Sequence, residues 1–74
     1  MNFGTAIKEI RVESGMSQRE LAEALKMTIA GVWKIENGRT IPKHMTIEKI
    51  CSVLHVPLAY LYNKSFGKED YICK

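Results

Sequence analysis

The order of apolar and polar positions along the chain predicts helices from its first residues onward. Phe3, Ile7 and Ile10 recur at helical spacing and line one side of a first helix over about residues 3–14. Gly15 follows, and glycine is the residue that most easily adopts the left-handed backbone in which many helices end. The sequence shows no strand-like alternation, internal repeat or low-complexity run before its tail.

Two short helices with a brief connection come next. The first, over about residues 18–25, begins with Ser17 and Glu20, the spacing at which each side chain accepts a hydrogen bond from the other's backbone amide. Thr28 then caps a third helix, which Gly38 ends. Helices joined by so few residues must cross at a steep angle, which predicts a helix-turn-helix.

The last predicted helices are a fourth over about residues 44–54 and a short fifth. Pro57 suits the first turn of this fifth helix, which runs to about Tyr62. Its core-facing residues are expected to be Leu58 and Leu61, and those of the fourth helix Ile47, Ile50, Cys51 and Leu54. Residues 63–74 are polar, so we expect an irregular tail, in which Tyr71-Ile72 can pair as a short strand.

Composition fits one small domain. A chain of 74 residues is too short for two cores, and 46% apolar with 26% charged residues is a globular balance. The predicted fold is therefore all-α, a compact five-helix domain over residues 3–62. No apolar run reaches the roughly 18 residues of a membrane span, and no signal segment opens the chain, so we expect a soluble cytoplasmic protein without a membrane partner. Its size favours binding across a surface over catalysis on a small-molecule substrate.

The formal net charge of +3 is unevenly distributed. Residues 1–27 carry four basic and four acidic side chains and are neutral, whereas residues 28–50 contribute +2 and residues 51–74 contribute +1. Positive charge from the middle of the chain onward permits a local surface that faces phosphates. An ordinary solvated surface explains the same total, so charge alone does not decide the function.

The cysteines provide little evidence for a metal site. Cys51 and His55 lie one helical turn apart, but two ligands are too few for a structural zinc ion, and no second pair follows. Cys51 is better explained as a small core residue in a reducing compartment. We therefore expect neither a metal nor a cofactor.

A helical wheel divides the third helix into two faces. With Val32 as the inward reference and about 100° per residue, the inward arc comprises Thr28, Ile35 and Glu36. The outward arc comprises Ala30, Trp33, Lys34 and Asn37, with Ile29 on its flank. An inward carboxylate needs a partner because an unpaired buried charge is costly, and Arg11, next to the apolar face of the first helix, is the natural candidate. We expect Arg11 and Glu36 to form a structural salt bridge rather than a catalytic pair.

The run SQRELAEALKMTIAGVWKIENGR, from Ser17 to Arg39, resembles the helix-turn-helix of the lambda-repressor and Cro-like family, also called the XRE family. The resemblance continues in IKEIRVESGM before it and in the segment from Pro42 to Leu61 after it, and it covers roughly residues 3–62. It implies a repressor-like transcriptional regulator, not an enzyme, that binds double-stranded operator DNA as a two-fold dimer. It also implies the internal salt bridge between Arg11 and Glu36.

The resemblance assigns roles to matching positions. The residues expected to meet base edges are Ile29, Ala30, Trp33 and Lys34. The residues expected to contact backbone phosphates are Gln18, Thr28, Asn37, Arg39 and Lys43. The physics agrees, since a helix that enters the major groove by its amino end presents its first outward turns to the bases. For Gln18 and Lys43 the plain alternative is a solvated surface residue.

Departures from the family pattern are Lys26 and His55, where glycine is usual, and Gly31, where serine or threonine is commoner. A lysine at a left-handed turn costs about 1 kcal/mol, and so does a glycine inside a helix. Of the base-reading set, Lys34 alone can bond guanine acceptors, while the apolar members suit thymine methyl groups. We expect a T-rich half-site with one guanine, or recognition that depends on DNA shape.

Two further hypotheses concern partners. Aromatic residues beyond the needs of the core predict a homodimer through Leu58, Tyr60, Tyr62 and Phe66, unless these rings simply cover the base of the core. An exposed tryptophan is also a typical anchor of protein interfaces. The alternative function is thus an adaptor or antitoxin-like module that docks a protein through Trp33, unless Trp33 packs inward.

Overall fold

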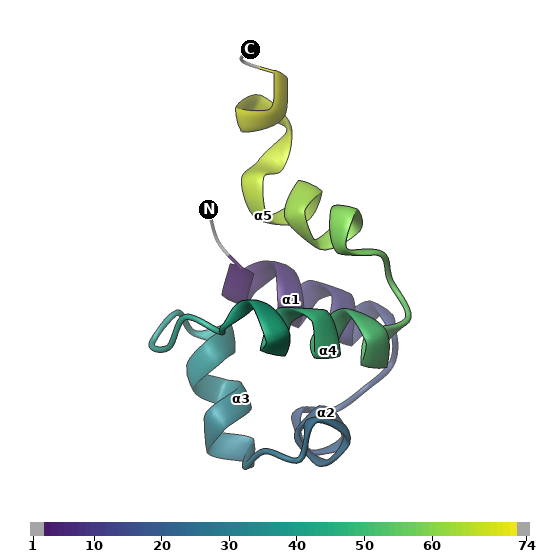
Figure 1. The fold of residues 1–74 in the computed structure, drawn as a ribbon, viewed down its shortest axis with the longest axis vertical. Coiled ribbons are helices and arrows are strands. Elements are labelled where there is room, and N and C mark those ends of the chain that lie inside the picture. Colours follow the sequence, from purple (N-terminus) through teal and green to yellow (C-terminus); the bar gives the residue numbers. More distant parts are fainter. Residues whose placement is uncertain (1–2, 73–74) are drawn as a thin grey trace.

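The computed structural model describes residues 3–72, and their side chains as far as residue 65. Five helices follow one another, with no strand in this part of the chain: α1 (Phe3–Glu13), α2 (Gln18–Leu25), α3 (Ile29–Glu36), α4 (His44–Leu54) and α5 (Leu58–Ile72). In Figure 1, α1 and α4 cross the middle of the molecule, α2 and α3 lie on one side of them, and α5 lies on the other. The predicted all-α class and the five helices are confirmed.

The core is a single apolar cluster to which every helix contributes. The fully buried side chains include Ile7, Ile10, Leu21, Val32, Ile50 and Leu61. Apart from Leu21, these are positions that the helical pattern predicts to face inward, and Cys51, Leu54 and Ile47 are buried beside them. Burial of so many aliphatic side chains, each worth about 1.5–3 kcal/mol, supplies the main stabilisation of a domain this small.

The first four helices end in the same way, with one residue in the left-handed conformation. After α3, Gly38 has φ +74°, its N–H donates to the carbonyl of Ile35 (3.2 Å), and the next N–H donates to the carbonyl of Lys34 (2.8 Å). These two bonds define a Schellman motif, which satisfies carbonyls that a helix end leaves open. Gly15 ends α1 with the same pair of bonds.

At the ends of α2 and α4 the left-handed residue is not glycine. Lys26 has φ 58° and His55 has φ 59°, and each is accompanied by the same two backbone hydrogen bonds. Both residues therefore occupy a conformation in which a Cβ atom crowds the following carbonyl, at a cost of about 1–2 kcal/mol. The strain expected at Lys26 is thus present, and His55 shows it as well.

The amino ends of the helices follow the sequence signals closely. Ser17 Oγ accepts from the N–H of Glu20 (3.0 Å) while Glu20 Oε1 accepts from the N–H of Ser17 (2.8 Å), so the reciprocal cap is formed. Thr28 Oγ1 accepts from the N–H of Gly31 (3.0 Å) and begins α3. Lys43 begins α4 without a side-chain cap.

The expectation of an irregular tail from residue 63 was wrong, because α5 continues to Ile72 and Tyr71-Ile72 belong to the helix rather than to a strand. Tyr62 packs edge-on against Phe3 of α1, with ring centroids 5.3 Å apart. Lys64 Nζ lies 3.4 Å from carboxylate oxygens of both Glu9 and Glu13. These contacts join α5 to the opposite end of the sequence, which local composition does not reveal. Cys73 lies outside the described residues.

The left-handed residues give a direct stability test. Lys26→Gly and His55→Gly should each raise the free energy of unfolding by about 0.5–1 kcal/mol, because glycine removes the Cβ strain but adds disorder to the unfolded chain. In a domain of this size that corresponds to a rise in Tm of about 2–8 °C, measurable by circular dichroism. Gly38→Ala is the matched opposite, since no atom lies within 4 Å of the added Cβ and its loss of stability reports backbone strain alone. Unchanged or lower Tm values for both glycine variants contradict this account.

Candidate nucleic-acid interface

Helix α3 has one buried and one exposed face. Val32, Ile35 and Glu36 are at most 6% exposed, whereas Trp33 is 45% and Ile29 42% exposed, and Ala30 and Lys34 are also at the surface. The two faces predicted by the helical wheel are therefore confirmed for the helix itself. Thr28 is the exception, because it is exposed rather than inward. As the capping residue it has extended backbone (φ −83°, ψ 157°), so helical angles do not apply to it.

Glu36 is held on the buried face by side chains from two other helices. Arg11 Nε donates to Glu36 Oε2 (2.7 Å), and Arg11 Nη2 donates to Oε1 (3.2 Å). A third guanidinium nitrogen, Nη1, donates to the carbonyl of Met16 (2.8 Å). Gln18 Nε2 also donates to Glu36 Oε1 (3.0 Å). The predicted ion pair is thus formed, and it joins the end of α1, the start of α2 and the end of α3.

The five residues predicted to contact phosphates lie at the start of α2, at the two ends of α3 and in the loop before α4. Gln18 and Thr28 stand at the amino ends of α2 and α3, where backbone N–H groups and the helix dipole favour an anion. Arg39 and Lys43 are exposed in the segment between α3 and α4. Asn37 caps the end of α3, with Nδ2 donating to the carbonyl of Trp33 (2.9 Å).

The side-chain amides of Gln18 and Asn37 each make one hydrogen bond within the domain. A side-chain amide carries two N–H donors, and in each residue the structure uses one of them, toward Glu36 and Trp33 respectively. The Gln18 bond was not anticipated from the sequence. It fixes the orientation of this amide relative to α3, which sequence patterns cannot indicate because the partners are 18 positions apart.

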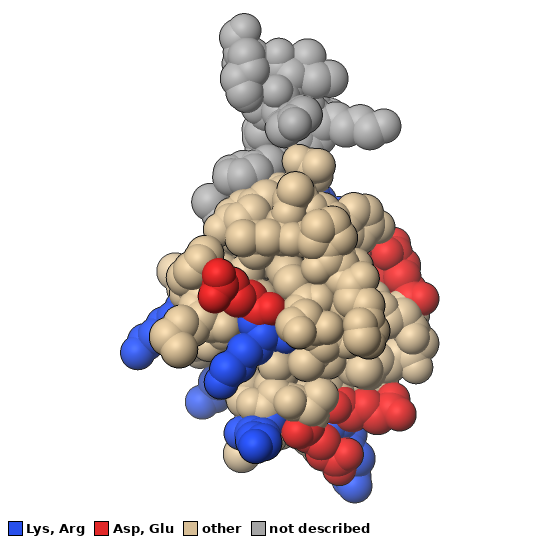
Figure 2. All heavy atoms as spheres, turned by 45° about the vertical axis from the view of Figure 1, so that its right-hand side comes forward, with Lys and Arg blue, Asp and Glu red and all other residues tan. Residues whose placement is uncertain are grey.

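Charge at this end of the molecule is mixed. In the face shown in Figure 2, Lys and Arg side chains gather over its lower part, where α2 and α3 lie in Figure 1, with acidic side chains among them. The surface is therefore not a uniform cationic face. Contacts to an anion must come from individually placed donors, such as Lys34, Arg39 and Lys43.

Sequence reasoning missed Gly4, which lies where α1 meets the end of α3. A Cβ atom at this position would lie 2.5 Å from the carbonyl oxygen of Ile35 and 2.6 Å from that of Glu36, closer than real contacts allow. The only available signal was a glycine inside a predicted helix, where it is unfavourable unless a close approach requires it.

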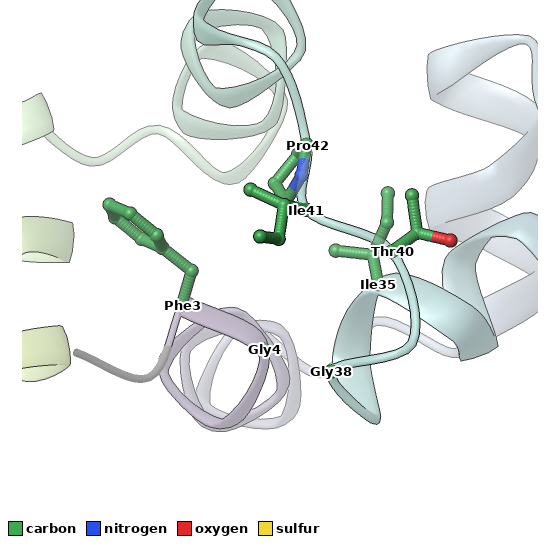
Figure 3. Close-up of a pocket in the computed structure, with 7 residues that line it drawn as sticks. All are labelled: Phe3, Gly4, Ile35, Gly38, Thr40, Ile41 and Pro42. Atoms are coloured by element: carbon green, nitrogen blue, oxygen red, sulfur yellow. The ribbon is translucent and has the colours of Figure 1, made fainter.

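A hollow of about 510 Å³ opens beside this contact. Figure 3 shows the residues that line it, from α1, α3 and the following loop: Phe3, Gly4, Ile35, Gly38, Thr40, Ile41 and Pro42. None of these side chains is ionisable, so the hollow offers no acid, base or metal ligand.

No residue set in the described part of the chain resembles a metal centre, since no group of three or more His, Cys, Asp or Glu side chains converges there. Cys51 is buried in the core, as expected, and burial raises the pKa of its thiol. The thiolate that binds metals is therefore disfavoured at this position. Within residues 3–72, none of the helices is both long enough and apolar enough to cross a membrane.

Comparison with known proteins identifies the family. The helix-turn-helix family model matches residues 7–61, which is most of the chain. The chain belongs to the XRE (lambda-repressor and Cro-like) helix-turn-helix family. This is a family of DNA-binding transcriptional regulators, which is not a class of enzymes.

Curated relatives of this XRE domain include a bacterial repressor and a phage protein. The HTH-type transcriptional repressor RghR of Bacillus subtilis is 34% identical over 70 residues, covering 93% of this chain and 52% of that protein. The ImmF control region 10 kDa protein of Bacillus phage phi105 is 36% identical over 59 residues, covering 80% of this chain and 66% of that protein. The chain thus spans about half to two thirds of the length of these relatives.

A solved structure shows the same fold. The clp gene regulator ClgR from Corynebacterium glutamicum superimposes with a TM-score of 0.84 at 25% sequence identity, covering 86% of this chain and 68% of that one. The helix order and arrangement described above are therefore those of a known gene regulator.

Breaking the ion pair from one side tests its structural role. Arg11→Met should lower the free energy of unfolding by about 3–5 kcal/mol, because it leaves the Glu36 carboxylate buried without its cation. Gln18→Ala, which removes one partly exposed hydrogen bond to the same carboxylate, should cost only about 1 kcal/mol. The double variant Arg11→Met/Glu36→Leu should be more stable than Arg11→Met alone. Urea titrations in which the double variant is the weaker one refute the assignment.

Proposed function

We propose that this domain is a sequence-specific DNA-binding transcriptional regulator, repressor-like in action, that works in the cytoplasm and inserts α3 into the major groove of an operator. The observation that carries the proposal is the division of α3. Its inward face is fastened through Glu36 to Arg11, while Trp33 and Lys34 are presented to solvent on a rigid helix. Rigid presentation of a few side chains on the exposed face of a helix is what base reading requires.

The chemistry of the exposed face indicates what it reads. Lys34 supplies the only charged donor, which suits the two acceptors of guanine. Ile29, Ala30 and Trp33 supply apolar contact for thymine methyl groups. A half-site rich in thymine with one guanine fits this set, and DNA shape contributes where the apolar side chains cannot discriminate.

Phosphate contacts from both sides of α3 would fix the register of the domain on the duplex. Gln18 and Thr28 support this role by their place at helix amino ends, and Arg39 and Lys43 by their exposure in the loop after α3. Asn37 contributes through the second N–H of its amide. None of these contacts carries sequence information directly.

We further propose that the domain binds DNA as a homodimer through α5. This helix lies on the side of the molecule away from α2 and α3, so pairing does not compete with DNA (Figure 1). Tyr60 is 39% exposed even though its hydroxyl donates to Glu13 Oε1 (3.2 Å). Leu58 is half-buried against the core and Tyr62 is half-buried against Phe3, so both offer less surface, and the Phe66 side chain lies outside the described residues. Recognition helices of the dimer should lie roughly 34 Å apart, one turn of the duplex.

Docking of a protein through Trp33 is the second candidate function, favoured by the exposure of this indole. The two functions differ in their salt dependence. Binding that releases counterions from phosphates weakens steeply as salt rises, whereas binding through an apolar tryptophan does not.

Selection of bound sequences from a random DNA pool, followed by titrations over a range of salt, tests the DNA-binding proposal. Lys34→Ala should reduce discrimination for the guanine-containing site by about 1–3 kcal/mol. Lys49→Ala is the matched control, because it removes the same charge from α4 and should leave discrimination unchanged. Failure to enrich any sequence, or affinity indifferent to salt, removes the proposal.

The dimer is tested by sedimentation. Tyr60→Ser combined with Phe66→Ser should shift the species to monomer, because both changes delete aromatic area from α5. Tyr60→Phe keeps the ring and should leave the dimer intact. An unchanged mass for the serine variant rules out this interface.

A further inference from the structure

We propose that Arg39 is a positioning residue that holds the indole of Trp33 in its base-reading orientation, so that a phosphate contact and a base contact are made by one stacked pair. This inference rests on the proposed DNA-binding function and names a determinant of its specificity. The observation behind it is that the Arg39 guanidinium carbon lies over the Trp33 ring, 5.9 Å from its centroid.

The backbone at the end of α3 brings the two side chains together. Gly38, in the left-handed conformation, reverses the chain, and the N–H of Arg39 then donates to the carbonyl of Lys34 (2.8 Å). Arg39 is therefore carried back along the last turn of α3, toward the face from which Trp33 projects. Its place beside the indole is a consequence of the Schellman motif and does not depend on the side chains alone.

Trp33 needs such a restraint because it is exposed on one side of a short helix. At 45% exposure the indole lacks the packing that fixes buried aromatic rings, and ordering it at the moment of binding reduces affinity. The hydrogen bond from Asn37 Nδ2 to the carbonyl of Trp33 fixes the backbone at this residue but not the ring. A cation stacked over an exposed ring shifts its orientations by about two- to fivefold, which is enough to define a preferred one.

An arginine side chain can stack on an indole ring and donate hydrogen bonds to a phosphate at the same time. The guanidinium is planar, so its face can stack on the indole while the N–H groups at its edge still point outward to an oxygen anion. A lysine at the same position keeps the charge but has no planar face. The substitution Arg39→Lys therefore removes the stacking on the indole while it keeps the positive charge.

The chain contains one tryptophan, so its fluorescence reports on Trp33 alone. In the DNA-free protein, Arg39→Lys and Arg39→Gln should both increase the quenching of this fluorescence by acrylamide and lower its anisotropy. Lys43→Gln, which removes a charge from the same loop, is the control and should change neither. Equal quenching in the wild-type protein and in Arg39→Lys overturns the proposal.

Titrations with the sequence selected from the random pool complete the test. Arg39→Lys should lower discrimination between that sequence and its single-base variants by about two- to fivefold while the salt dependence stays the same. Lys43→Gln should weaken binding to all sequences and lower the salt slope by about one. In a Trp33→Leu background, Arg39→Lys should no longer affect discrimination.

The outcomes separate this inference from the function on which it rests. If the wild-type protein enriches a sequence but Arg39→Lys discriminates as well as it does, the positioning role is refuted and DNA binding stands. If the wild-type protein enriches nothing, the DNA-binding function fails, and the specificity role of Arg39 fails with it.

Discussion

The interaction on which the rest of the structure depends is the ion pair between Arg11 and Glu36. It has little contact with water, with side-chain exposures of 10% and 0%, and it accepts a further bond from Gln18. A charge pair in this position adds less to stability than its geometry suggests, because both groups lose their hydration. What it does add is orientation, since α3 can satisfy this carboxylate in only one rotation about its axis. The outward direction of Trp33 and Lys34 follows from that choice.

Most of the fold could be predicted because its signals are local. Capping residues, glycines and a 3.6-residue apolar period lie within a few positions of the helix ends that they specify, and α2 and α4 agree with their predicted ranges. The length of α5 could not be predicted in this way. Lys64, beyond the predicted end of the helix, is joined to Glu9 across 55 positions, and a contact over such a separation leaves no periodic pattern in the sequence.

In the candidate interface, too, local features could be predicted from the sequence and long-range contacts could not. The outward face of α3 follows from helical geometry once Glu36 is placed inside, and the structure agrees on every helical position in that face. Features that depend on contacts between separate segments of the chain could not be predicted. The stacking of Arg39 on Trp33 depends on a left-handed Gly38 and a chain reversal, and the close approach at Gly4 depends on how two helices pack. Both require three-dimensional information that no local rule contains.

The missing side chain at Gly4 has an electrostatic consequence. It allows the first turn of α1 to sit against the last carbonyl groups of α3, so that the positive pole of one helix meets the negative pole of the other. Opposite partial charges at these two helix ends favour the contact. A side chain at this position would therefore separate two attracting backbone dipoles as well as force the helices apart.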